Sequence, residues 1–101
     1  MSEFWVPVDP DALRRERARA RELRQSQWWK RRIADGVCHY CRGRVGSRNL
    51  TMDHVVPMAR GGRSTRGNLV PACKDCNSKK KSMVPVEWQA YLRSLGAVSD
   101  D

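Results

Sequence analysis

Two cysteine pairs constrain this chain more than any other feature of its sequence. The first pair is Cys38 and Cys41, and the second pair is Cys73 and Cys76. Two intervening residues let both thiolates of a pair reach the same tetrahedral ion at about 2.3 Å, and two such pairs complete a four-sulfur shell. We therefore predict one structural zinc ion in a closed shell that leaves no open position for catalysis.

Disulfide bonds are the alternative use of four cysteines. The segment from Met1 to Asp11 has no basic stretch followed by an apolar one, so we expect no secretory signal. Disulfides are rare in proteins that stay in a reducing compartment, and a disulfide within C-x-x-C is typical of redox sites rather than of structural bridges. Zinc is the favoured interpretation, and a redox or metal-sensing role is retained as an alternative.

Size and composition narrow the class of protein. The 101 residues predict a single domain, and with 40 % apolar and 7 % aromatic residues its core is marginal without an additional crosslink. The chain is too short for a Rossmann enzyme or a barrel, and it has no glycine-rich phosphate loop. No apolar run approaches the roughly 20 residues of a membrane span.

Helical patterns flank a central region that lacks them. We predict one long helix over residues 10–34, and Asp9 can cap it. This helix is the main part of a basic extension over residues 1–36. The core is expected over residues 37–83, with short extended pieces around residues 50–56 and 69–70, the second ended by Pro71, and one or two helical turns within residues 74–83. A last helix is expected over residues 84–96, followed by a disordered tail over residues 97–101.

The charge of the chain indicates its partner. Lys and Arg total 20 against 11 Asp and Glu, which gives a net charge of +9 with histidine neutral. Such an excess favours a polyanion, with nucleic acid first and an anionic membrane second. On the predicted first helix, a stripe at steps of three and four contains Arg14, Arg17, Arg21, Arg24, Trp28 and Arg31. A second basic group contains Arg60, Arg63, Arg66, Lys79, Lys80 and Lys81.

The two basic groups carry different expectations. The stripe is either a solvated, charge-rich face or a clamp on phosphates through Arg17, Arg21 and Arg24. Trp28 is expected to pack against the core, because a small domain needs its tryptophans there. The second group lies beside the central motifs and is the better candidate for contact with nucleic acid. Because nothing resembles a base-reading helix or finger, we predict weak sequence specificity.

Polar residues at defined spacings occupy the region between and after the cysteine pairs. They are Asp53-His54 followed by Pro57, then Gly61-Gly62, Asn68-Leu69, and Asn77 with Lys80 directly after the second pair. Taken singly each is a weak signal, since a lone histidine is more often structural and an asparagine after glycine is usually a turn residue. Taken together, the stretch from Cys38 to Lys80 resembles the zinc-containing HNH nucleases of the ββα-metal class.

This resemblance implies a fold and a set of roles. The fold would be α+β, with a small ββα-metal core, a four-cysteine zinc site, a long N-terminal helix and a C-terminal helix. His54 would be the general base, and Asn68 would hold the loop and the histidine in place. Asp53 and Asn77 would bind a catalytic Mg²⁺ or Mn²⁺. The family name implies histidine where this chain has Asn77, a known variant that is a neutral and weaker ligand.

These residue types suit hydrolysis of a phosphodiester, which needs a positioned base and a cation near the developing charge. A histidine with a pKa near ~6.5 is available as a base at pH 7, and carboxylate and amide oxygens suit hard cations. Adjacent strand residues point to opposite sides, so Asp53 and His54 can face one point only where the strand ends or twists. Pro57 and the loop after it favour a strand end.

The leading hypothesis is a metal-dependent DNA endonuclease that leaves a 5′-phosphate and a 3′-hydroxyl. The alternative is a non-catalytic, zinc-dependent nucleic-acid-binding module in which the Asp-His pair is structural. Neither a membrane nor a small-molecule cofactor is expected, and the resemblance suggests the cytoplasm of a bacterium or a phage origin. The sequence leaves the form of the DNA and the oligomeric state open.

Overall fold

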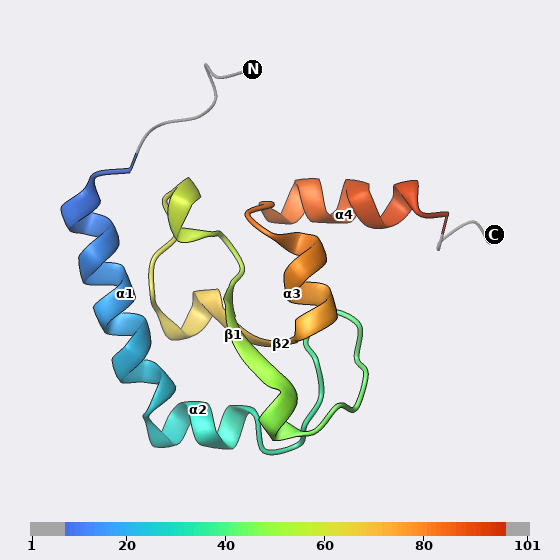
Figure 1. Cartoon of the computed structure of the whole chain (residues 1–101), viewed down its shortest axis with the longest axis horizontal. Helices are drawn as coiled ribbons and strands as arrows, with labels where there is room; N and C mark the ends of the chain where they lie inside the picture. Colours follow the sequence, from blue (N-terminus) through green and yellow to red (C-terminus); the bar gives the residue numbers. More distant parts are fainter. Residues whose placement is uncertain (1–7, 97–101) are drawn as a thin grey trace.

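The computed structural model describes residues 8–96, so the predicted tail over residues 97–101 lies outside the described part of the chain. The structure combines helices with a two-stranded antiparallel sheet, which confirms the predicted α+β class with a ββα core (Figure 1). The elements, in chain order, are α1 (Pro10–Arg24), α2 (Gln27–Arg32), β1 (Leu50–His54), β2 (Leu69–Cys73), α3 (Lys74–Lys80) and α4 (Pro85–Ser94). No described helix is long and apolar enough to cross a membrane.

The hairpin of β1 and β2 is the centre of the molecule. Leu50 pairs with Cys73 at one end of the hairpin, and His54 pairs with Leu69 at the other. The expectation that Pro71 ends the second strand is wrong, because β2 continues to Cys73. The Pro71 carbonyl accepts a hydrogen bond from the His39 backbone N–H at 2.8 Å, so the backbone polar groups of Pro71 face away from β1. A proline is tolerated there because its missing N–H is not needed for strand pairing.

The predicted single helix over residues 10–34 is two helices. α1 ends at Arg24, and α2 begins after Ser26, whose hydroxyl accepts a hydrogen bond from the Trp29 backbone N–H at 3.2 Å. The same hydroxyl donates to the carbonyl of Leu23 at 2.6 Å and closes the turn. Serine is a strong helix N-cap, which explains why the helix restarts at this position. Figure 1 shows α1 along one side of the hairpin and α2 turned beneath it.

The buried core is built around three of the four cysteines. Its cluster consists of Cys38, Leu50, Ala72, Cys73 and Cys76, with Cys38 and Ala72 fully buried. α3 packs against both strands, and α1 contacts the 3₁₀ turn Met58–Arg60. Three of the cysteines therefore lie in the interior of this small domain, whereas Cys41 is exposed at its surface.

The tryptophans of α2 divide between the core and the surface. Trp29 is buried, with 4 % of its surface exposed. Trp28 is only half-buried, and the guanidinium of Arg66 lies 5.5 Å from its ring centre. The expectation that Trp28 packs against the core is met only in part, because Trp29 rather than Trp28 is the fully buried tryptophan of α2.

Candidate active site and zinc site

The four cysteines converge as their spacing predicts. All four Sγ atoms lie within 4.8 Å of one another, and the Sγ atoms of Cys41 and Cys73 are 3.9 Å apart. A tetrahedron with metal–sulfur bonds of about 2.3 Å has edges of about 3.8 Å, which agrees with this separation. All four are free thiols rather than disulfides. The cluster is therefore compatible with a structural zinc ion.

Backbone amides prepare these thiols as ligands. Cys38 Sγ accepts hydrogen bonds from the N–H groups of Tyr40 at 3.4 Å and Cys73 at 3.3 Å. Burial of Cys38 opposes its ionisation, yet the backbone hydrogen bonds outweigh burial and lower its pKa to about 7. The N–H of Gly43 also donates to Cys41 Sγ at 3.3 Å, which lowers the pKa of Cys41, but burial and the neighbouring thiols raise that pKa overall in the cluster of thiols. A thiolate is the form that binds zinc, so this arrangement favours metal binding.

Asp53 lies on the face of β1 that packs against α3. Its carboxylate is buried and accepts hydrogen bonds from the Tyr40 hydroxyl at 2.6 Å and from the Lys80 ammonium at 3.2 Å. Burial, followed by the hydrogen bond to Asp53, raises the pKa of Tyr40, which therefore stays protonated and remains a donor. Asp53 Oδ2 is thus held by two donors, while its other oxygen accepts no hydrogen bond from a described residue.

Lys80 is an internal residue, contrary to its predicted place on a nucleic-acid-binding surface. Only 1 % of Lys80 is exposed, and besides Asp53 its ammonium donates to the His54 carbonyl at 3.1 Å. The error arose because the run Lys79-Lys80-Lys81 looks uniformly solvated in the sequence. On a helix, however, consecutive side chains point in different directions, and α3 turns Lys80 alone toward the sheet.

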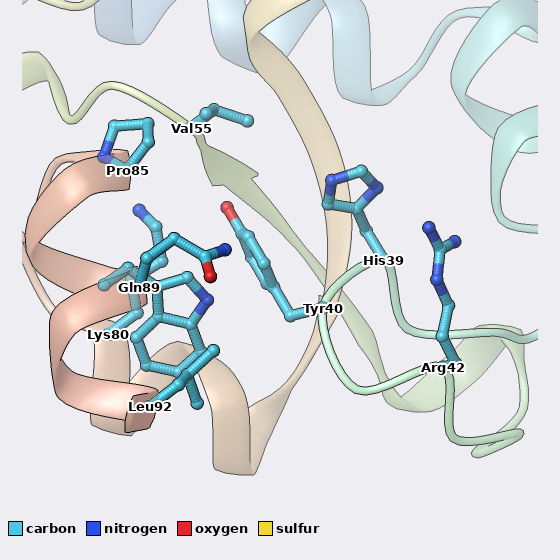
Figure 2. Close-up of a pocket in the computed structure, with 9 residues that line it drawn as sticks. His39, Tyr40, Arg42, Val55, Lys80, Pro85, Gln89 and Leu92 are labelled. Atoms are coloured by element: carbon cyan, nitrogen blue, oxygen red, sulfur yellow. The ribbon is translucent and has the colours of Figure 1, made fainter. Parts of the chain in front are cut away.

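A hollow of about 330 Å³ opens above this buried network. Figure 2 shows the Tyr40 ring within it, with His39 and Arg42 of the first cysteine loop on one side and Lys80 and Gln89 on the other. The hollow thus brings the first cysteine loop, α3 and α4 together beside the Asp53 network.

Asn77 is the other predicted metal ligand, and it lies on the same side of the hairpin as Asp53. Its Nδ2 donates to the Thr51 hydroxyl at 2.9 Å, and Thr51 and Asp53 share one face of β1 because they are two residues apart. Asn77 directly follows Cys76 on α3, so the cysteine cluster fixes its position. The Oδ1 atom of Asn77 accepts no hydrogen bond from a described residue, so this oxygen is available as a ligand for a cation.

His54 faces the opposite side of β1, toward α1. Its Nε2 is 2.9 Å from the hydroxyl oxygen of Ser64. Burial lowers the pKa of His54, and the nearby carboxylates of Asp53 and Glu16 partly oppose that shift. A lowered pKa keeps the imidazole neutral at pH 7, which is the form that a general base requires. β1 ends at His54, so the strand end expected from Pro57 is present, although the contacts of Asp53 and His54 lie on different faces.

A basic hollow of about 350 Å³ includes His54. Arg17, Arg21 and Arg24 of α1 line it, and none of the three forms a salt bridge with any residue in the described range. Three guanidinium groups around an imidazole supply the positive charge and the hydrogen-bond donors that phosphate groups favour.

Asn68 organises the loop after β1 rather than the imidazole itself. Its Oδ1 accepts from the Val56 N–H at 2.9 Å, and its Nδ2 donates to the carbonyls of Val56 at 3.0 Å and Arg63 at 2.8 Å. The hydrogen-bond partner of His54 is Ser64, not Asn68. Sequence reasoning missed Ser64 and its partner Glu16, because neither belongs to the motif and they are 48 residues apart.

Most of the other basic residues predicted to contact nucleic acid interact with side chains of the protein itself. Arg60 pairs with Glu87 of α4, Arg63 pairs with Glu16, and Lys79 pairs with the exposed Asp75. Arg66 lies over Trp28, and Lys81 is exposed at the end of α3 with a positive φ of 50°. Among the basic candidates, Arg17, Arg21 and Arg24 of α1 are therefore those that line the hollow with His54 and form no salt bridge with a described residue.

Comparison with known proteins agrees with the site geometry. A search among curated proteins found no match to this chain. The family model described as HNH endonuclease matches residues 38–91, which is more than half of the chain and includes the cysteine cluster, the hairpin, α3 and most of α4. With asparagine at the third position of its motif, this chain belongs to the HNH endonuclease family.

Proposed function

We propose that this protein is a metal-dependent DNA endonuclease in which His54 is the general base. The observation that carries the proposal is the position of His54, a neutral imidazole at the end of β1 in a hollow lined by three unpaired arginines. In that position a phosphodiester is held by the arginines while the imidazole faces a water molecule. Family membership gives the nuclease class, and this geometry supports the assignment of the base.

The proposed reaction is a hydrolysis with balanced proton transfer. His54 takes a proton from water, the water oxygen bonds to phosphorus, and the bond between phosphorus and the 3′ oxygen breaks. The 3′ oxygen takes a proton from solvent, which leaves a 5′-phosphate and a 3′-hydroxyl. The unpaired guanidinium groups of Arg17, Arg21 and Arg24 stabilise negative charge on the phosphate.

Asp53 and Asn77 are the proposed ligands of the catalytic cation. Each has one oxygen without a described partner, and carboxylate and amide oxygens are the donors that Mg²⁺ and Mn²⁺ prefer. Asp53 and His54 point to opposite faces of β1, so we propose that the scissile phosphate lies across the end of the strand, where the bound cation would supply electrostatic stabilisation of the charge that develops on the phosphate oxygens. The Lys80 ammonium already balances part of the Asp53 charge at 3.2 Å, so we propose that the cation binds weakly.

The whole described chain contributes to the proposed domain. The cysteine cluster, with zinc bound, keeps β2 and α3 in register and so positions Asn77 beside the hairpin.

The DNA contacts that we propose are on two parts of the surface. The first is α1, with Arg17, Arg21 and Arg24. The second consists of four exposed residues of the loop after β1 and of α3 and its end, which are Arg63, Arg66, Lys79 and Lys81.

One observation favours the second candidate, a zinc-dependent nucleic-acid-binding module without catalysis. Asp53 is already bound by Tyr40 and Lys80, and His54 faces the other side of the strand. A module of this kind would use the same basic hollow to hold DNA and would not cut it.

Cleavage of supercoiled plasmid distinguishes the two functions. Wild-type protein with Mg²⁺ or Mn²⁺ is expected to nick or linearise the plasmid, and a chelator is expected to stop it. His54→Ala is expected to fold, to bind DNA and not to cut. The other histidine offers a matched control, because His39→Gln changes an imidazole outside the basic hollow and should still cut. Equal cutting by the wild type and His54→Ala would exclude His54 as the base, and binding without cutting by the wild type would favour the second candidate.

A further inference from the structure

The Ser64 side chain is held from two directions beneath His54. Ser64 is 1 % exposed, and its hydroxyl oxygen lies 2.6 Å from the backbone carbonyl oxygen of Glu16 and 2.9 Å from His54 Nε2. Its backbone N–H donates to the Glu16 carboxylate at 2.6 Å. One residue of α1 therefore fixes both the backbone and the hydroxyl of Ser64.

The direction of each hydrogen bond follows from counting protons. A carbonyl oxygen has no hydrogen to give, so the 2.6 Å contact between two oxygens requires the single hydroxyl proton of Ser64 to point at the Glu16 carbonyl. The hydroxyl can then only accept from the imidazole, and Nε2 of His54 must carry a proton. In a neutral imidazole the other nitrogen, Nδ1, is then the unprotonated one.

We infer that Ser64 and Glu16 are positioning residues that hold His54 in the Nε2–H tautomer, so that Nδ1 is the atom that accepts the proton from water. This inference rests on the proposed role of His54 as the base. When Nδ1 takes the proton, the imidazolium keeps its Nε2–H bonded to Ser64, so no rearrangement of the hydrogen bonds is needed during the step. No described residue bonds to Nδ1.

The opposite tautomer is disfavoured by the same contacts. With Nδ1 protonated, the Ser64 hydroxyl would have to turn its proton to Nε2, and its oxygen would then lie 2.6 Å from the Glu16 carbonyl oxygen with no proton between the two acceptors. Two oxygen lone pairs at that distance repel each other, so the tautomer with a free Nδ1 predominates.

The inference gives α1 a second role in the site. α1 lies outside the matched residues 38–91, yet it supplies Glu16, and the Glu16 carboxylate also pairs with Arg63 at 3.1 Å. The basic helix therefore does more than attract phosphate, because it also sets the orientation of the base.

Nitrogen NMR of the two imidazole rings tests the tautomer without any need for cleavage. Uniformly ¹⁵N-labelled protein is measured at a pH where His54 is neutral, and the spectrum of His54→Ala identifies which ring signals belong to His54. The inference expects Nε2 of His54 to appear as the N–H nitrogen and Nδ1 as the unprotonated nitrogen. A protonated Nδ1 with an unprotonated Nε2 would overturn it, whatever the protein does to DNA.

Variants connect the tautomer with catalysis. Ser64→Ala is expected to give a mixture of both tautomers and to lower kcat by about tenfold with an unchanged KM for DNA. Ser26→Ala is the control, because it removes a serine hydroxyl that also has two hydrogen bonds, at the half-buried cap of α2, and should leave both tautomer and kcat as in the wild type.

A conservative change at Glu16 separates positioning from general stability. Glu16→Gln keeps an oxygen that can accept from the Ser64 N–H and should retain the wild-type tautomer, whereas Glu16→Ala should not. Equal tautomer populations in Glu16→Gln, Glu16→Ala and the wild type would contradict the role of the Glu16 side chain. Cutting by His54→Ala would instead refute the proposed function, while the NMR result would stand on its own.

Discussion

The ammonium of Lys80 lies 3.2 Å from the carboxylate of Asp53, and both groups are buried beneath α3. Removing one member of a buried ion pair leaves the other charge without compensation, which typically costs about 3–5 kcal/mol. We expect Lys80→Met to lower the free energy of unfolding by an amount of this order in a denaturant titration. Lys79→Met removes a neighbouring lysine that is exposed and should change stability little. Equal stability of the two variants would contradict the buried pair.

Metal removal should unfold the domain rather than only inactivate it. Three of the four cysteines belong to the core cluster, so we expect zinc binding and folding to be coupled. We expect one zinc ion per chain by elemental analysis, and a large fall in Tm after treatment with a strong chelator. Zinc should restore the Tm and Mg²⁺ should not.

Cys73→Ser tests the same coupling within the chain. This variant should melt at a lower temperature than the wild type and bind less zinc, because Cys73 is a buried member of the cluster. A Tm unchanged from that of the wild type would show that the cluster does not stabilise the fold.

Stability should fall in acid through Glu16. The hydrogen bond from the Ser64 N–H holds the pKa of Glu16 below its usual value of 4.5, against the opposing effect of burial and with help from Arg63. The unfolded chain then binds the proton more tightly than the folded one, so the stabilisation is present above the unfolded pKa and is lost as the pH falls through the folded pKa. Glu16→Gln should therefore be less stable than the wild type near neutral pH, and this difference should shrink in acid. Glu22→Gln, at an exposed position of the same helix, should follow the wild type.

Charge reversal on α1 should weaken the binding of DNA. Arg17→Glu with Arg24→Glu places acidic groups in the hollow around His54, and each lost phosphate contact lowers the salt dependence of log K by about 0.9. A fluorescence titration of a DNA duplex at several salt concentrations measures both effects. The control is Arg48→Glu with Arg93→Glu, which changes the net charge equally at exposed positions outside this hollow. Equal loss of affinity in both double variants would indicate a general charge effect.

Gly62 should not tolerate a side chain. A Cβ atom at this buried position would lie 1.6 Å from the carbonyl oxygen of Val56, so the loop after β1 would have to move. We expect Gly62→Ala to lower the Tm strongly and to weaken cleavage. Gly67→Ala, in the same loop, would meet no atom within 4 Å and should melt close to the wild type.

Features that depend only on neighbouring residues could be predicted from the sequence. The C-x-x-C spacing determines how two sulfurs reach one ion, so the cysteine cluster could be predicted before the structure. The extended pieces predicted on either side of the Gly-Gly loop correspond to β1 and β2, although Pro71 proved compatible with β2 because its carbonyl faces His39. The side-chain cap at Ser26 is a local signal as well, and the strong helix-forming residues around it concealed the break.

Contacts between distant residues could not be predicted in the same way. Lys80 looks like one of three surface lysines until its position on α3 places it against Asp53. Ser64 and Glu16 are 48 residues apart, and nothing in either segment indicates that they meet. The partner of the histidine is therefore a property of the fold, whereas the histidine itself belongs to the motif.

The break in the helix at Gln25 and Ser26 lets the side chains of α1 and those of α2 point in independent directions. Each residue of a continuous helix rotates the next side chain by about 100°, so an unbroken helix would tie the direction of Glu16 to that of Trp29. With the turn between them, Glu16 faces Ser64 from α1 while Trp29 faces the interior from α2. An insertion or deletion at this turn would therefore change how α2 packs without rotating Glu16 on α1. The contact of Glu16 with Ser64, and through it the orientation of the His54 ring, does not depend on how α2 fits the core.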